Sequence, residues 1–297
     1  QPTVKMTFAV NTSPFAGQEG EYCTSRNLRE RLFKELDTDV ALRVEDGAGT
    51  DEFIVSGRGE LHLSILIERM RREGHELQVA RPEVIMHEED GTMCEPIEDV
   101  WIDVPEAYVG PIIEKMGRRK GELKNMHVDS GTANFYFTIP TRGLIGYRNE
   151  FLTDTKGLGI MNTLFAGFER SVGEIESNAH GSLISFESGT SNTYGMLNAQ
   201  ERGTLFITPS LDVYEGQIVG QNGKPEDLEV NICKEKRLSN MRSKGDGVAE
   251  AMKSPRTMGL EAALEYIGDD ELVEVTPKSI RLRKRILSAM ERKRVRK

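Results

Sequence analysis

Cysteine is scarce in this sequence, and the few cysteines are far apart. Cys23, Cys94 and Cys233 form no C-x-x-C pair among the 297 residues. An odd number of distant cysteines argues against both a disulfide framework and a zinc site, and it is typical of a reducing compartment. We therefore expect a cytoplasmic location.

Long hydrophobic runs and the main nucleotide-binding signature are also missing. No apolar run approaches the ~20 residues that a membrane-spanning helix needs, so we expect no membrane contact. No G-x-x-x-x-G-K-[ST] segment occurs, which excludes a P-loop nucleotide site.

The residue groups that resemble catalytic or metal sites have simpler interpretations. His62 and Glu60 lie two positions apart on an expected helix, so their side chains diverge and form no acid–base pair. The cluster "MHEEDG" (86–91) is expected at a solvated hairpin tip, because a metal ion needs more converging ligands. We predict no catalytic residue, no cofactor and no metal in this chain.

Charge is distributed unevenly along the sequence. The net charge is −9, but residues 234–256 carry +4 and residues 278–297 carry +9, which leaves −22 for all other residues. An acidic body with separate basic segments favours a polyanionic partner that is contacted locally. A basic run can also balance the acidic residues of the chain or form a solvated helix face, and both this interpretation and the functional one stay open for 278–297.

Two stretches of the chain repeat the order strand, helix, strand, strand, helix, strand. In the first, strands are expected at 3–10, 40–46, 52–57 and 75–84, with helices at 24–36 and 59–74. In the second, strands are expected at 99–105, 123–129 and 133–139, with helices at 107–121 and 143–154. This order is typical of the ferredoxin-like fold, in which both helices pack on one face of an antiparallel sheet. We predict such domains at 1–81 and 82–170.

The remaining residues, 171–297, have a different character. They are rich in Gly, Ser, Thr and Asn at first, which indicates short strands and turns, and a helix is expected at 258–268. A hairpin is expected at 271–284, with its turn at Thr276–Ser279. We predict an α+β protein: two ferredoxin-like domains, then a mainly β domain with an inserted helix and a basic loop. The first residue, Gln1, begins a strand-like run, so we expect an internal fragment.

The basic loop contains "KEKRLSNMRSKGDG" (234–247), in which cations alternate with small polar residues. Aromatic residues are absent from it, so we expect contacts to phosphate and ribose rather than stacking on bases. A solvated loop without function is the alternative, and the length of the segment favours function. The RNA-binding candidates are Lys234, Lys236, Arg237, Asn240, Arg242, Lys244, Lys253 and Arg256.

Three segments resemble a known family. "SGRGELHLSILIERMRREG" resembles domain III of translational GTPases of the elongation factor G group, and "IPTRGLIGYRNEFLTDTKGLGIMN" resembles their domain V. "AHGSLISFESGTSNTYGMLNAQERGTLFI" and "KEKRLSNMRSKGDG" resemble the C-terminal domain of the BipA (TypA) branch. The chain is thus similar to the C-terminal portion of a BipA/TypA-type GTPase.

This resemblance implies a parent GTPase that is stimulated by the ribosome and acts in translation, stress and cold response, and large-subunit assembly. GTP and Mg²⁺ would bind a domain missing from this chain, so the resemblance implies no catalysis here. The implied partners are large-subunit RNA near the stalk base, A-site tRNA, and the small subunit through domain III, with the protein a monomer. Domain V candidates for RNA contact are Arg118, Arg119, Lys120, Arg142 and Arg148.

Two rival functions belong to other classes. A tandem ferredoxin-like module that senses a small molecule would need an apolar pocket between the two sheets. An acylphosphatase-type enzyme would need an Arg and an Asn that converge on a phosphate. Arg26 and Asn27 are neighbours on an expected helix and face different ways, which argues against the enzyme.

Overall fold

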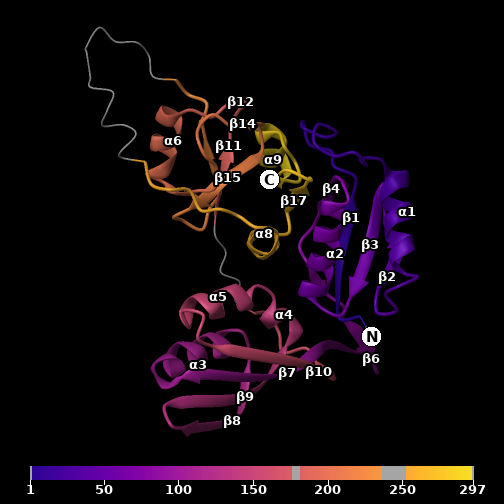
Figure 1. Ribbon diagram of the computed structural model, residues 1–297, viewed down its shortest axis with the longest axis vertical. Helices are drawn as coiled ribbons and strands as arrows, with labels where there is room; N and C mark the ends of the chain where they lie inside the picture. Colours follow the sequence, from indigo (N-terminus) through magenta and orange to yellow (C-terminus); the bar gives the residue numbers. More distant parts are fainter. Residues whose placement is uncertain (1, 176–180, 236–251, 296–297) are drawn as a thin grey trace.

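The computed structural model describes residues 2–175, 181–235 and 252–295, which form three packed units (Figure 1). The first unit is drawn in indigo and purple, the second in magenta, and the third in orange and yellow. Within these ranges, no helix is both long and apolar enough to cross a bilayer.

The first unit has the predicted order of strands and helices. Its sheet runs β4-β1-β3-β2 with antiparallel neighbours, which confirms the ferredoxin-like prediction. A short strand then pairs with β1 and leads toward the second unit. The elements are β1 (Val4–Ala9), α1 (Ser25–Glu35), β2 (Arg43–Asp46), β3 (Glu52–Gly57), α2 (Glu60–Arg72), β4 (Leu77–Val79) and β5 (Glu83–Val84).

Local signals in the sequence set the ends of both helices in this unit. The hydroxyl of Thr24 accepts a hydrogen bond of 3.2 Å from the Asn27 N–H, so Thr24 caps α1. Gly74 has a φ of +96°, and this left-handed residue lets the His75 N–H donate to the Met70 carbonyl at 3.0 Å. Both ends agree with the sequence prediction.

The second unit repeats the same topology in the sheet order β10-β7-β9-β8. Its two main helices share one core with the sheet, because Ile112, Met116, Tyr147 and Phe151 pack with the inward residues of the strands. Both helices therefore cover the same face. The elements are β6 (His87–Glu89), β7 (Thr92–Pro105), η1 (Glu106–Tyr108), α3 (Val109–Arg118), β8 (Glu122–Asp129), β9 (Thr132–Pro140), α4 (Thr141–Leu144), α5 (Tyr147–Asp154) and β10 (Ile160–Arg170).

The structure corrects two details of this unit. The helix expected at 143–154 is broken into α4 and α5, because Ile145 (φ −57°, ψ +123°) and Gly146 (φ +74°, ψ −5°) form a turn. The residue that ends α3 in the left-handed region is Lys120, with φ +64°, rather than Gly121. Lys120 takes the strained conformation so that the Gly121 N–H can donate to the Met116 carbonyl at 2.8 Å.

The third unit is mainly β, as predicted, with helices inserted between short strands. The predicted hairpin is present, and the Ser279 N–H closes its turn by donating to the Thr276 hydroxyl at 2.8 Å. The elements are β11 (Ser182–Ser185), β12 (Gly189–Thr190), α6 (Thr193–Gln200), β13 (Gly203–Leu205), β14 (Asp212–Val213), β15 (Gln217–Asn222), β16 (Leu228–Val230), α8 (Leu260–Tyr266), β17 (Glu271–Val275), β18 (Ile280–Lys284) and α9 (Ala289–Val295).

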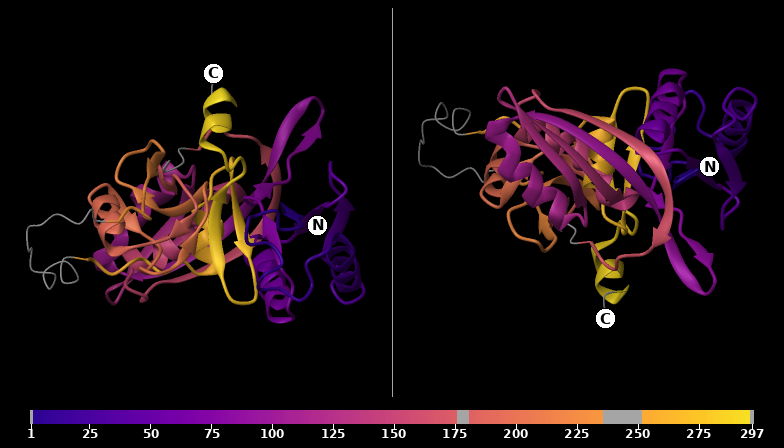
Figure 2. Two further views of the ribbon diagram at one scale, coloured as in Figure 1. Left: turned by 90° about the horizontal axis from the view of Figure 1, so that it is seen from above. Right: turned by 90° about the horizontal axis from the view of Figure 1, so that it is seen from below.

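The first and third units share one sheet, which the sequence did not predict. The hairpin strand β17 pairs with β4, so the strand order runs β16-β11-β15-β18-β17-β4-β1-β3-β2 without interruption. Figure 2 shows the yellow hairpin directly beside the indigo strands of the first unit. Leu264 of α8 and Val273 of β17 belong to the same apolar core as Phe8 of β1. The two units are therefore joined through both backbone pairing and a common core.

A buried polar network follows this junction. The fully buried carboxylate of Glu274 accepts hydrogen bonds from Asn11 at 3.0 Å, Ser13 at 2.9 Å, the Tyr214 hydroxyl at 2.7 Å and Arg281 at 3.0 Å. These partners come from both units. Because a buried carboxylate is stable only when its oxygens are satisfied, the network fixes how the hairpin sits against the first unit.

Candidate nucleic-acid interface

Part of the predicted RNA-binding loop lies beyond the residues that the structure describes. Lys236, Arg237, Asn240, Arg242 and Lys244 fall in 236–251, outside the described ranges. Lys234, at one end of that segment, and Lys253 and Arg256, beyond its other end, are described. The described part of the site therefore consists of the two places where the chain enters and leaves the basic segment.

Helix α6 holds both ends. Asn192 caps α6 by accepting from the Gly195 N–H at 2.9 Å, and its side-chain amide donates to the Cys233 carbonyl at 2.8 Å. At the other end of the helix, Gln200 accepts from the Lys253 N–H at 2.8 Å. One helix thus fixes where the chain leaves at 233 and where it returns at 253.

The approach of this helix to the chain before the basic segment depends on a glycine. A Cβ built on Gly195 would lie 2.5 Å from the Ile232 carbonyl oxygen, far inside the normal contact distance. Met196 and Ile232 are both buried in the apolar core of the third unit. Glycine at 195 therefore allows the backbone at 232 to pack directly on α6.

The three described cations of this segment are available to a ligand. Lys234, Lys253 and Arg256 are exposed, and none of them forms an ion pair with another residue in the described ranges. The Arg256 N–H donates to the Leu205 carbonyl at 2.8 Å, which fixes its backbone while its side chain stays exposed. Fixed backbone with free cationic side chains is suited to phosphate contacts.

The basic residues near the C-terminus are used differently. Arg281, Arg283, Lys284 and Arg292 are buried or nearly so. The Lys284 ammonium lies 2.8 Å from both Asp227 and Glu271, and Arg281 pairs with Glu274 at 3.0 Å. Arg283 donates to the neutral side chains of Thr12 and Gln78, and Arg292 pairs with Glu229 at 3.3 Å. Of the two interpretations left open for 278–297, Arg281, Lys284 and Arg292 therefore fit internal charge balance rather than a ligand site.

The five candidates from the second unit divide into two groups. Arg118, Lys120 and Arg148 are exposed, with Arg118 paired to Glu114 on the same helix at 2.7 Å. Lys120 and Arg148 form no ion pair within the described part of the chain. These three side chains can reach a partner from the helical side of the unit.

Arg119 and Arg142 instead hold the second unit together. The Arg119 guanidinium donates to the carbonyls of Gly143 and Ile145 at 3.0 and 3.1 Å, and it pairs with Glu150 at 2.7 Å. Arg142 pairs with Glu95, whose side chain is completely buried, at 3.0 Å. Burial alone would raise the pKa of Glu95, but hydrogen bonds from Arg142 and from the Val172 N–H outweigh it and lower the pKa.

The groups that resembled catalytic or metal sites are accounted for by local structure. The His62 ring bonds to Asp39 through Nε2 and accepts from the Arg58 N–H at 3.2 Å through Nδ1. The "MHEEDG" segment forms the predicted hairpin, with Asp90 and Gly91 at positive φ between β6 and β7. The described residues contain no group of His, Cys, Asp and Glu side chains suited to a metal ion.

A junction of all three units lies next to α8. The Gly146 N–H donates to Glu60 Oε2 at 3.2 Å, and Asn149 donates to Glu265 Oε2 at 2.9 Å. A Cβ on Gly146 would lie 2.6 Å from Glu265 Cγ, which explains why the break between α4 and α5 contains glycine. Sequence reasoning missed this junction, because Glu60, Gly146 and Glu265 share no motif.

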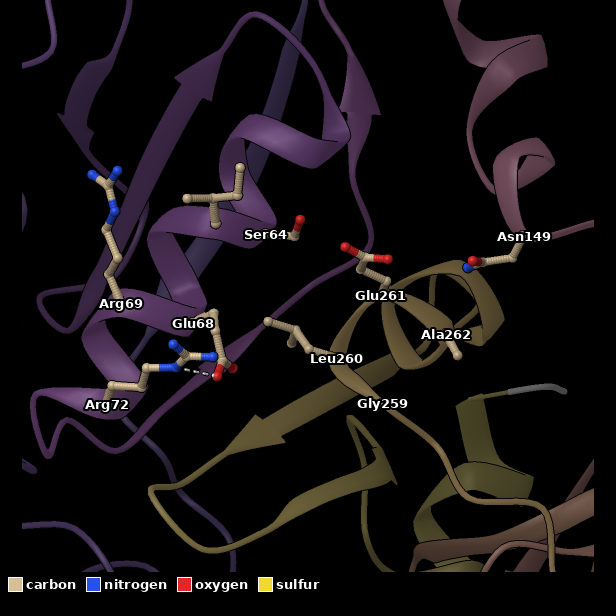
Figure 3. Close-up of a pocket in the computed structure, with 10 residues that line it drawn as sticks. Ser64, Glu68, Arg69, Arg72, Asn149, Gly259, Leu260, Glu261 and Ala262 are labelled. Carbon is tan, nitrogen blue, oxygen red and sulfur yellow. Dashed lines mark hydrogen bonds and ion pairs between the residues drawn. The ribbon is translucent and has the colours of Figure 1, made fainter. Parts of the chain in front are cut away.

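A cavity of about 580 Å³ opens beside this junction (Figure 3). Figure 3 shows α2 on one side, with Glu68, Arg69 and Arg72, and the start of α8 on the other, with Leu260 and Glu261. Asn149 reaches toward α8 from α5. The cavity lies between the helices α2, α5 and α8 rather than between the two sheets, where a small-molecule sensor would need its pocket.

Comparison with known protein families divides the chain into three consecutive matches. Residues 21–81 match the model of elongation factor G domain III, and residues 92–179 match the model of the elongation factor G C-terminus. Residues 180–289 match the TypA/BipA C-terminal domain. The last match contains α6 and both described ends of the basic segment.

Curated relatives align along nearly the whole chain. A large ribosomal subunit assembly factor BipA from Synechocystis sp. is 53% identical over 285 residues, which is 96% of this chain and 48% of the relative. The BipA of Bacillus subtilis is 50% identical over 299 residues, covering 100% and 49%. A TypA-like chloroplastic protein of Arabidopsis thaliana, SVR3, is 50% identical over 284 residues, covering 95% and 42%.

The chain spans about half the length of these relatives. A solved structure from Thermus thermophilus has a TM-score of 0.35 and 15% identity over 58% of this chain and 41% of that one, which is too weak to inform the fold. The three family matches and the relatives agree. The chain therefore belongs to the BipA/TypA family, as the C-terminal portion of a BipA/TypA-type protein.

Proposed function

We propose that this chain is the ribosome-contacting region of a translational GTPase that acts in assembly of the large ribosomal subunit. The relatives named as large ribosomal subunit assembly factors support this proposal. The chain contains no P-loop segment, so no residue in it is assigned to GTP or Mg²⁺, and the chain itself performs no bond-making. The nucleotide site belongs to a part of the protein outside this chain.

One observation carries the proposed RNA contact. Lys234, Lys253 and Arg256 are exposed and unpaired among the described residues, while the cations of the hairpin and α9 are largely engaged with carboxylates. These three cations flank a segment whose sequence contains four more: Lys236, Arg237, Arg242 and Lys244. Exposed, unpaired cations thus adjoin the most basic internal stretch of an otherwise acidic chain, which suits phosphate binding at a defined site.

The anchoring by α6 explains how such a segment binds with useful affinity. Ordering a free loop on RNA costs conformational entropy, and this cost is lower when the loop ends are already fixed. Asn192 and Gln200 fix those ends. We infer that α6 is the support from which the basic segment reaches ribosomal RNA and A-site tRNA.

The other two units are proposed to orient this contact. Arg118, Lys120 and Arg148 on the second unit would contact large-subunit RNA near the stalk base, and the first unit would face the small subunit. The protein would act as a monomer in the cytoplasm, with roles in translation and in stress and cold response. The family matches to elongation factor G domains support these assignments.

The test uses charge reversal of the described cations in the full-length protein. A K234E/K253E/R256E variant is compared with K34E/R43E/K224E, which reverses three exposed cations elsewhere that form no ion pairs within the described residues. We expect the first variant to lose co-sedimentation with large ribosomal subunits and the second to retain it. Binding should also weaken as salt rises, with a log–log slope of about 0.7–0.9 for each phosphate that the protein neutralises. Equal retention of both variants would overturn the proposal.

A further inference from the structure

The sheet of the second unit leaves one face uncovered by helices. Strand residues alternate, and Val100, Ile102 and Phe137 point into the core beneath α3 and α5. The opposite face, called the open face here, carries residues that the strand register places next to one another. These residues are Asp99, Trp101, Asp103, Asn134, Tyr136 and Leu164.

The open face is accessible and partly apolar. Trp101 is 39% exposed and Leu164 is 62% exposed, although both lie within the sheet. Figure 2, right, shows the strands of this sheet from below, in front of the third unit and beside the first. An exposed aromatic and aliphatic surface on a sheet is a common feature of binding sites.

Two aromatic rings form the centre of this face. Trp101 on β7 lies opposite Tyr136 on β9, and their rings stack with centroids 5.4 Å apart and planes 14° apart. Because the rings support each other, they present a rigid platform. The outward faces of such rings attract cations, and tryptophan does so most strongly.

Carboxylates flank the platform on both sides. The Tyr136 hydroxyl donates to one oxygen of Asp99 at 2.9 Å, and the Asn134 amide donates to one oxygen of Asp103. No described residue bonds to the second oxygen of either carboxylate. Lys124, which lies near Tyr136, is paired with Glu122 at 2.7 Å and forms no ion pair with Asp99.

We propose that the open face binds an arginine- or lysine-rich segment of a partner protein. A cationic side chain lies over the Trp101–Tyr136 rings, and its neighbours pair with the free oxygens of Asp99 and Asp103. Charge complementarity selects this partner, because the carboxylates attract cations and repel the phosphates of RNA. This surface is separate from the basic segment, and it adds a protein contact to the RNA contact proposed above.

The chain provides its own reporter for the test, because Trp101 is its only tryptophan. The protein is titrated with a short peptide of alternating arginine and glycine, with a glutamate–glycine peptide of equal length, and with oligouridine. We expect a saturable change in Trp101 emission with the arginine peptide alone, and a weaker response at higher salt. A response to oligouridine without a response to the arginine peptide would show a base-stacking site and overturn the proposal.

A second measurement separates the open face from general attraction to an acidic protein. Binding of the labelled arginine peptide is followed by fluorescence anisotropy for D99N/D103N and for E88Q/E106Q, which removes two exposed carboxylates elsewhere in the unit. Asparagine can still accept from Tyr136 and Asn134, so the face should keep its structure. We expect D99N/D103N to weaken binding about fivefold, the combined effect of two exposed ion pairs. Equal weakening by both variants would contradict a site on this face.

Discussion

Glu60 is the first residue of α2 and lies at the junction of the three units, where its carboxyl group has an unusual electrostatic environment. It accepts one hydrogen bond, from the Gly146 N–H, and it forms no ion pair within the described residues. Burial, helped by the neighbouring carboxylates of Glu265 and Glu261, raises the pKa of Glu60 to about 7 against the opposing effect of that hydrogen bond. The junction therefore contains a carboxyl group that titrates near neutral pH.

Because the pKa of Glu60 is raised, we expect the stability of the protein to depend on pH. The pKa of Glu60 in the folded protein lies above the ordinary value of 4.5. Its protonated form therefore contributes its full stability below about pH 4.5, and this contribution is lost as the pH rises through 7. A Glu60→Gln variant keeps an acceptor for Gly146 and removes the charge. We expect its free energy of unfolding to exceed that of the parent by about 1–3 kcal/mol at pH 8, and to match it near pH 4.

Urea unfolding at the two pH values measures this effect. The control is Glu88→Gln, which removes a charge at the exposed hairpin tip and should change stability little at either pH. A Glu60→Gln gain of equal size at both pH values would show that packing, rather than ionisation, is responsible.

A second residue-scale prediction concerns Arg142. Its guanidinium is the partner of Glu95, whose side chain is 0% exposed. Removing one member of a buried pair leaves an uncompensated charge, which typically costs about 3–5 kcal/mol. We expect Arg142→Met to lower the free energy of unfolding by about 2–4 kcal/mol, because Arg142 itself is partly exposed. Arg148→Met, at an exposed site on α5, should stay within about 0.5 kcal/mol. Circular dichroism during urea unfolding compares the two variants.

Arg142 also shows why single residues are harder to predict than elements. In sequence, Arg119, Arg142 and Arg148 are all cations within or beside an expected helix, and the pattern does not distinguish them. The partners of Arg119 and Arg142, Glu150 and Glu95, are distant in sequence and become neighbours only after the sheet forms. A basic residue can be identified from its letter, but its partner depends on the tertiary fold.

At the scale of elements, α6 is the support of the proposed interface. Gly195 lets it lie against Ile232, and an alanine there would place a methyl group 2.5 Å from a carbonyl oxygen. We expect Gly195→Ala to reduce the free energy of unfolding by about 1–3 kcal/mol, because backbone rather than a flexible side chain must move. It should also weaken binding to large ribosomal subunits by displacing the start of the basic segment.

The matched control is Gly117→Ala in α3, where an added Cβ meets nothing within 4 Å. Alanine has the higher helix propensity, so this variant should gain up to about 1 kcal/mol. Thermal unfolding and co-sedimentation of both variants test the prediction. A neutral Gly195→Ala would mean that α6 and residue 232 are not held together.

Elements with strong hydrophobic periodicity were predictable, because only one type of secondary structure fits such a pattern. The alternation of Val100, Ile102 and Val104 with Trp101 and Asp103 matches a strand with one covered face. The break between α4 and α5 was not predictable, because an isolated glycine is tolerated inside many helices. Its cause, the approach of Glu265, comes from a helix distant in the sequence.

At the scale of the whole molecule, the shared sheet predicts cooperative behaviour of the first and third units. Leu264 of α8 is fully buried in the core that contains β1 and β17. Leu264→Ala should destabilise the protein by about 2–5 kcal/mol. Amide hydrogen exchange should then accelerate in β1 and β4 as well as in β17, since these strands belong to one sheet.

Ile139→Ala provides the comparison, because Ile139 is fully buried in the separate core of the second unit. It should accelerate exchange in β7, β8, β9 and β10 and leave β1 and β17 protected. If Leu264→Ala altered exchange only in the third unit, the pairing between β4 and β17 would not couple the two units.

The sequence predicted each unit but not the pairing of β17 with β4. Hydrophobic alternation shows that a strand has a covered face, and it says nothing about which strand lies at its edge. The pairing is fixed instead by the buried network around Glu274, whose partners Asn11 and Tyr214 come from distant parts of the chain.

The unbroken sheet also couples the orientation of the first unit to that of the third unit. If the first and third units were tied by a linker alone, a tilt of the first would be absorbed by the linker. With β4 hydrogen-bonded to β17, a tilt must swing the far end of the sheet, where β16 leads to Cys233 and the start of the basic segment. A change in the orientation of the first unit should therefore also move the cations at the start of the basic segment.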